Sequence, residues 1–131
     1  MASLTIKRMT AMHNVAAILL GEEPVKAFKD SPTAQRRLEE ATGKLGVQQH
    51  TFFEPKELKA PRPSSVKHVL VTLMDVDEGV DEAVLAEAVG SHYTSKGKEN
   101  PPTISSLLAG LRMGNGYGFR RIGSRYWLVT P

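Results

Sequence analysis

The segment 104–129 constrains the fold most, because a helix pattern runs directly into a hairpin pattern. Apolar residues at positions 104, 107, 108 and 111 have the i, i+3, i+4, i+7 spacing of one helix face. Two short runs, Phe119–Ile122 and Arg125–Val129, then flank Gly123-Ser124, and glycine at the first turn position is typical of a two-residue hairpin loop. We therefore expect a helix from about Pro102-Thr103 and a C-terminal β-hairpin.

Two further helices are expected before this segment. The first follows a serine N-cap at position 64 or 65 and carries apolar residues at helical spacing: Val66, Val69, Leu70 and Leu73. The second runs from about Val80 to Val89 and ends at Gly90, a residue type common just past a helix C-terminus. Its spacing predicts four inward residues, which are Val80, Ala83, Val84 and Ala88.

The segment Pro61–Pro63 predicts a boundary, since prolines favour an extended connection. Residues 1–60 are expected to form a small helical region, with helices over Met9–Leu20 and from an N-cap at Ser31, before Pro32, to Gly43 or Gly46. The run 47–53 favours a strand. The expected fold class is mainly α with a small β component. Residues 1–60 are expected to mediate oligomerisation or partner binding, or to have a purely structural role.

Composition limits the alternatives. The chain has 131 residues, a formal charge of +3 and 40% hydrophobic residues, which indicates one or two small globular domains. Cysteine is absent, which excludes disulfides, thiolate zinc sites and cysteine nucleophiles. The longest apolar run, Val15–Leu20, is far shorter than the roughly 20 residues of a membrane span. It is followed by Gly21-Glu22-Glu23-Pro24, whereas a signal peptide would have a cleavage site of small residues there. A cytoplasmic or nucleoid-associated protein is expected.

Residues 64–131 resemble the winged-helix (winged helix-turn-helix) superfamily. The stretch Asn100-Pro-Pro-Thr-Ile-Ser-Ser-Leu-Leu108 is similar to the start of a recognition helix, and Phe119-Arg-Arg-Ile-Gly-Ser-Arg-Tyr-Trp-Leu128 is similar to the closing wing. The resemblance implies three helices followed by the hairpin, with the third helix and the wing contacting DNA. The loop 91–102 is longer than the tight turn of simple helix-turn-helix proteins.

Charge placement supports the same hypothesis. From Ser64 onward the chain carries seven bases and seven acids, and six of the seven bases follow position 95. A local basic end attracts phosphates even in a neutral domain, because distant charges are screened. The candidate DNA contacts are loop lysines, small polar residues at the helix start, and arginines of the helix and wing: Lys96, Lys98, Thr103, Ser105, Ser106, Arg112, Arg120, Arg121 and Arg125.

No other chemistry is indicated. The four histidines, at positions 13, 50, 68 and 92, lack metal-ligand spacing. No nucleophile–base set or catalytic carboxylate pair stands out, so no enzyme activity, cofactor, metal or small-molecule ligand is expected. The hypothesis is a small transcriptional regulator that binds double-stranded DNA, with a possible homodimer through residues 1–60. The alternative is a protein-interaction winged helix that docks on or inhibits a nucleic-acid-processing enzyme without binding DNA.

Overall fold

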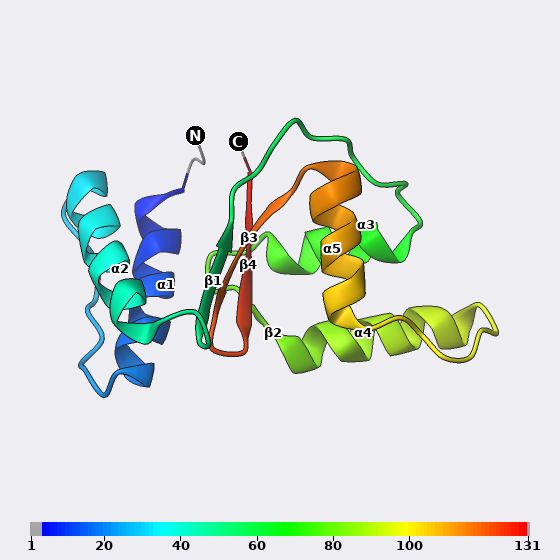
Figure 1. Cartoon of the computed structure of the whole chain (residues 1–131), viewed down its shortest axis with the longest axis horizontal. Helices are drawn as coiled ribbons and strands as arrows, with labels where there is room; N and C mark the ends of the chain where they lie inside the picture. The colour runs from blue at the N-terminus through cyan, green and yellow to red at the C-terminus, as the bar shows by residue number, and fades with distance from the viewer. Residues whose placement is uncertain (1–3, 131) are drawn as a thin grey trace.

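In the computed structural model, which describes residues 4–130, a small antiparallel sheet lies between two groups of helices (Figure 1). One group is α1 (Ile6–Leu19) and α2 (Ser31–Leu45). The other is α3 (Val66–Met74), α4 (Glu82–Ser95) and α5 (Ile104–Asn115). The strands are β1 (His50–Phe53), β2 (Val80–Asp81), β3 (Gly118–Ile122) and β4 (Arg125–Val129), in the sheet order β1-β3-β4-β2. The expected class, mainly α with a small β component, is confirmed.

Side-chain caps start the helices close to the predicted positions. Ser65 caps α3 by accepting a hydrogen bond from the backbone N–H of His68 at 3.3 Å, which confirms the serine N-cap. Asp30, not Ser31, caps α2 by accepting from the backbone N–H of Thr33. Gly46, at φ 77°, ends that helix, because glycine tolerates the left-handed region.

The second predicted helix of the C-terminal half has a different start, end and buried face. Val80 and Asp81 form strand β2, and α4 begins only at Glu82 and continues through Gly90 to Ser95. Val84 is 46% exposed whereas Leu85 is fully buried. The helix phase inferred from 80, 83, 84 and 88 was therefore wrong, because the first of these residues belongs to a strand.

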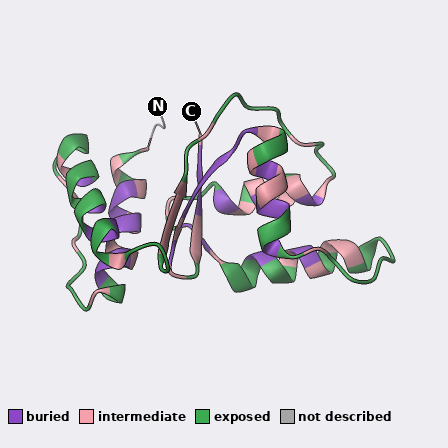
Figure 2. Ribbon diagram, in the orientation of Figure 1, coloured by how far each residue is buried: buried purple, intermediate pink, exposed green. Residues whose placement is uncertain are grey.

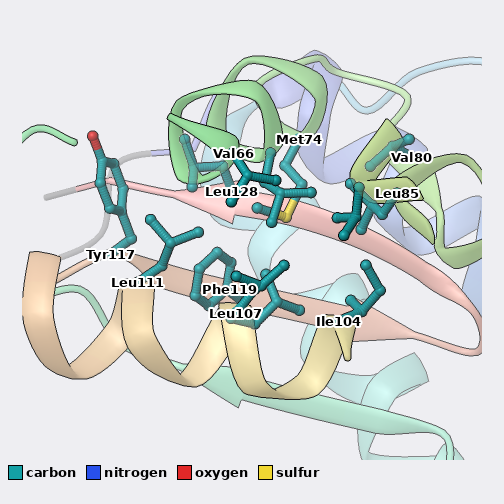
Figure 3. Packing of buried hydrophobic residues seen from close by; sticks show 13 residues of the cluster. Val66, Met74, Val80, Leu85, Ile104, Leu107, Leu111, Tyr117, Phe119 and Leu128 are labelled. Atoms are coloured by element: carbon teal, nitrogen blue, oxygen red, sulfur yellow. The ribbon is translucent and has the colours of Figure 1, made fainter. Parts of the chain in front are cut away.

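The β3–β4 hairpin is buried on both faces. Its register pairs Phe119 with Leu128 and Arg120 with Trp127, and successive side chains of a strand point to opposite faces. Phe119 and Leu128 join the core formed with α3, α4 and α5 (Figure 3). Ile122 and Trp127 join a second core formed with α1 and α2. Figure 2 shows buried residues on the inner sides of both helix groups.

Residues 1–60 share the sheet with the C-terminal half. Strand β1 pairs with β3, with Phe53 opposite Phe119, and the predicted boundary at Pro61–Pro63 falls in the irregular connection between β1 and α3. The apolar stripe of α1, which includes Met9, Met12 and Ala16, packs against α2 and the sheet of its own chain. The N-terminal region is thus the third layer of one structure.

Two glycines let the connection after β1 lie directly on the end of α5. A Cβ on Gly116, at φ 77°, would stand 2.1 Å from the carbonyl oxygen of Glu57, and one on Gly118 would stand 2.5 Å from that of Phe53. Both glycines thus permit a close backbone contact that holds residues 53–59 against the end of α5.

Candidate nucleic-acid interface

The outward face of α5 is covered by small side chains. Ile104, Leu107, Leu108 and Leu111 are buried, as the spacing predicts, which turns the opposite side of the helix away from the core. Ser105 and Ser106 are exposed there, and Ala109 and Gly110 are half-buried. Thr103 caps the helix, with its hydroxyl accepting from the backbone N–H of Ser106 at 3.2 Å. Such a surface lets another molecule approach the helix backbone closely.

Arg112 borders one side of this face. Its guanidinium carbon lies 4.2 Å from the centre of the Phe53 ring, a cation–π contact that attaches α5 to strand β1. Within residues 4–130, no carboxylate lies within ion-pair distance of Arg112. A half-buried guanidinium without an acidic partner can donate hydrogen bonds to an anionic group of another molecule.

Lys67, which was not among the candidate DNA contacts, borders the other side. A Cβ built on Gly110 would lie 3.3 Å from Lys67 Cε and 3.4 Å from its Nζ, so the lysine from α3 extends over α5. Lys67 Nζ also donates to Asn115 Oδ1 at 3.4 Å. The sequence contained only one sign of this role, a lysine on a predicted helix. The structure shows that this helix, α3, shares a core with α5.

Two more lysines, Lys56 and Lys59, lie in the connection after β1, at the end of α5. The backbone N–H of Lys56 donates to the Gly116 carbonyl, and that of Lys59 to the Asn115 carbonyl, each at 2.8 Å. Both lysine side chains are exposed. Sequence reasoning missed them because it assigned residues 1–60 to a separate region, whereas these contacts pair residues nearly 60 positions apart.

Arg120 is a correction to the predicted DNA contacts. Its side chain is buried, donates from Nη2 to Glu39 Oε1 at 3.1 Å, and stacks over the Phe52 ring at 4.3 Å. Arg120 points to the α1–α2 side of the sheet, because it pairs with Trp127 and Phe52. It contributes to the interior between α2 and the sheet and cannot reach a phosphate in this conformation.

The other two hairpin arginines are also engaged within the chain. Arg121 donates to the carbonyls of Gly123 and Gln48 and to the Thr51 hydroxyl. Arg125 donates to the carbonyls of Glu78 and Gly79. These bonds fix the hairpin to the segments beside it. Contact with a phosphate would compete with the bonds that they already make.

Lys96 and Lys98 lie at the C-terminal end of α4. Lys96 is the C-cap of α4, and the backbone N–H of Lys98 donates to the Tyr93 carbonyl. Figure 1 shows this end of α4 projecting away from both the sheet and α5. The structure therefore brings Ser105, Ser106 and Arg112 together and adds Lys56, Lys59 and Lys67, but it separates the two loop lysines from them.

Comparisons with known proteins identify no family for the chain. No family model, no curated protein and no solved structure matches it. In the part of the chain that the structure describes, no helix has both the length and the apolar character needed to cross a membrane. Over the same residues, 4–130, no three His, Asp or Glu side chains gather in a way that would hold a metal.

Proposed function

We propose that the chain binds duplex DNA, with α5 as the helix that contacts the major groove. The observation that carries the proposal is the outward face of α5, where small side chains lie between the cations of Arg112 and Lys67. Small residues let a helix backbone approach base edges, which hydroxyls and arginine read by hydrogen bonding. The surrounding lysines would neutralise backbone phosphates.

The order of elements from α3 onward supports this proposal. Helix, short strand, two helices and a hairpin follow one another over residues 66–129, and β2 pairs with β4 of the hairpin. The winged-helix resemblance implies three helices followed by a hairpin, and this order is compatible with it, so we propose α5 as the recognition helix. The proposed contact differs from the sequence hypothesis, because Lys56, Lys59 and Lys67 take the place of the wing arginines and of the two loop lysines.

A protein-docking module is the second candidate function. Met113, on the outward face of α5, is 80% exposed, and methionine is a flexible apolar residue frequent at binding surfaces. In this alternative, α5 packs against a nucleic-acid-processing enzyme. Dimer formation through residues 1–60 would require side chains outside the two cores, such as Ile18, which is 65% exposed.

Selection from a random DNA pool, followed by gel-shift titration at several salt concentrations, tests the proposal. The selected duplex should bind with an affinity that falls steeply with salt, because bound phosphates release counterions. Lys67→Ala should flatten the slope of log affinity against log salt by about one unit. Lys29→Ala removes the same charge from the α1–α2 connection, across the sheet from α5, and should leave the slope unchanged.

A palindromic consensus would indicate a dimer, because two-fold protein symmetry is mirrored in the site. Failure to enrich any sequence, combined with equal weak binding by the wild type and both variants at low salt, would contradict the DNA proposal. Met113 and its neighbours would then be tested as a protein-docking surface.

A further inference from the structure

A cavity of about 300 Å³ lies between α5 and the sheet, beside the candidate interface. Its sheet residues share one face, because Phe53 pairs with Phe119, and Arg121 pairs with both Thr51 and Tyr126. Helix α5 closes the other side with Ser105, Leu108, Ala109 and Arg112. The cavity therefore results from strand β1 extending the hairpin below the helix.

The walls of the cavity are apolar in one part and cationic in another. Phe53, Leu108, Ala109 and Phe119 provide aromatic and aliphatic surface. Ligand sites typically combine such surface with a few convergent polar groups and have volumes from about 300 Å³ upward. The cavity has the dimensions of a site for one small molecule.

The polar groups of the cavity favour an anion. Two lining residues are arginines and none is acidic. Arg121 donates to three oxygen acceptors, whereas Arg112 has, among residues 4–130, no such acceptor and lies over the face of Phe53. Arg112 thus has N–H donors free to pair with a carboxylate in the bidentate geometry that a guanidinium prefers.

Two hydroxyl groups add hydrogen-bonding capacity. Tyr126 lines the cavity, and burial, followed by the nearby negative charge of Glu82, raises the pKa of its phenol. The phenol therefore remains a neutral donor at physiological pH. Ser105 supplies a second hydroxyl from the first turn of α5.

We propose that this cavity binds a small monocarboxylate with an aromatic or aliphatic body, the carboxylate pairing with Arg112 and the body packing between Phe53, Leu108 and Phe119. Such a ligand complements both parts of the cavity, because its apolar end displaces water from apolar walls. The site departs from the expectation that the chain has no small-molecule ligand. The site shares Arg112 with the proposed DNA contact, but its test does not depend on DNA binding, because the ligand is titrated in the absence of DNA.

Two-dimensional NMR titration of the full chain, without DNA, tests the site with four probes: benzoate, hexanoate, benzamide and inorganic phosphate. Benzoate or hexanoate should give saturable shifts confined to amides around the cavity, including those of Ser105, Ala109 and Phe53. Benzamide has the ring without the charge and should bind at least about tenfold more weakly, since it cannot form charge-assisted hydrogen bonds with Arg112. Phosphate, which has charge without an apolar body, should also bind more weakly.

Two variants and one control locate the binding. Arg112→Gln should weaken benzoate binding by about tenfold or more. Ala109→Phe keeps the charge and should abolish binding by filling the cavity. Arg37→Gln is the matched control, because Arg37 lies over another phenyl ring, 5.9 Å from that of Phe28 on the α1–α2 side of the sheet. It should bind benzoate like the wild type.

Several results would overturn the proposal. One is the absence of saturable shifts with both carboxylates at concentrations approaching tens of millimolar, beyond the roughly 1 mM range of weak ligands. Another is phosphate binding as tightly as benzoate, which would indicate anion attraction alone. If Arg112→Gln or folded Ala109→Phe bound benzoate as tightly as the wild type, the ligand would lie outside this cavity.

Discussion

The two faces of the β3–β4 hairpin bury different kinds of side chain. On the face toward α3, α4 and α5, Phe119 and Leu128 join a core of aliphatic residues. On the face toward α1 and α2, Trp127 and Ile122 meet methionines and alanines, and Arg120 is buried beside them. The first core is formed by the helices of the C-terminal half, and the second by the N-terminal helices of the same chain.

The difference shows that position in a wing-like hairpin does not make an arginine available to DNA. Arg120 and Arg121 are neighbours in sequence but point to opposite faces, because side chains alternate along a strand. Arg120 is buried and donates to the exposed Glu39, whereas Arg121 donates to the carbonyls of Gly123 and Gln48. The N-terminal layer converts the hairpin from a surface element into the central layer of the fold.

Trp127→Ala should produce the largest stability change and tests whether the α1–α2 face is a real core. Trp127 is fully buried, and its indole N–H donates to the Asp77 carbonyl at 2.9 Å. The free energy of unfolding should fall by about 3–5 kcal/mol, measured by urea denaturation. Substitutions at surface positions usually cost less than about 1 kcal/mol. A loss of that size for Trp127→Ala would mean that α1 and α2 are not packed on the sheet.

Leu108→Ala makes the corresponding test on the opposite face. Leu108 is buried between α5 and the sheet, so the variant should lose about 2–5 kcal/mol of unfolding free energy. The adjacent Ala109→Ser substitution should have little effect, because Ala109 is half-buried at the edge of α5, beside the open cavity, and outside the core. Equal thermal shifts for the two variants would mean that α5 has the opposite orientation.

Gly116→Ala should have a smaller effect and tests the contact between the two halves. A methyl group at φ 77° and 2.1 Å from the Glu57 carbonyl oxygen should destabilise the chain by about 1–2 kcal/mol or more. Gly43→Ala is the control, because Gly43 lies within α2 with no atom within 4 Å of its Cβ position. That change should stabilise by about 0.5–1 kcal/mol. Thermal denaturation compares them, and matching stabilisation at both positions would contradict the close contact.

The smallest expected effect is a pH dependence at His50, on the α1–α2 face. Burial, followed by the positive charge of Arg120, lowers the pKa of His50 below its ordinary 6.5, whereas Glu39 raises it and Arg121 lowers it. The folded state then binds fewer protons than the unfolded state, so stability is retained above about pH 6.5 and falls as the pH drops below it. His50→Gln should reduce the difference in urea midpoint between pH 7.5 and 5.5. If His50→Gln left this difference in urea midpoint unchanged, His50 would not be the cause of the pH dependence.

The sequence predicted the elements whose patterns are local. The stripe on α5, the Ser65 cap and the Gly123-Ser124 turn depend on neighbours within a few positions, and each occurs as expected. The short strand β2 was taken for the start of a helix because two residues carry no periodicity. Its identity depends on pairing with Tyr126 and Arg125, more than 40 positions away.

The candidate interface was less predictable for the same reason. Ser105, Ser106 and Arg112 follow from the phase of one helix, and the structure keeps them on one side. The availability of an arginine depends on what packs around it, and for Arg120 that is Glu39 of α2 and Phe52 of β1. Likewise, Lys56 and Lys59 reach α5 only through the pairing of β1 with the hairpin.

Fluorescence anisotropy with the selected duplex, at several salt concentrations, tests most directly the claim that α5 contacts DNA. Arg112→Gln and Arg37→Gln each remove one guanidinium that lies over a phenyl ring, on opposite sides of the sheet. Arg112→Gln should cost about 1–3 kcal/mol on the preferred sequence and relax specificity there, whereas Arg37→Gln should bind like the wild type. Equal affinities for all three proteins, with no dependence on sequence, would contradict the claim.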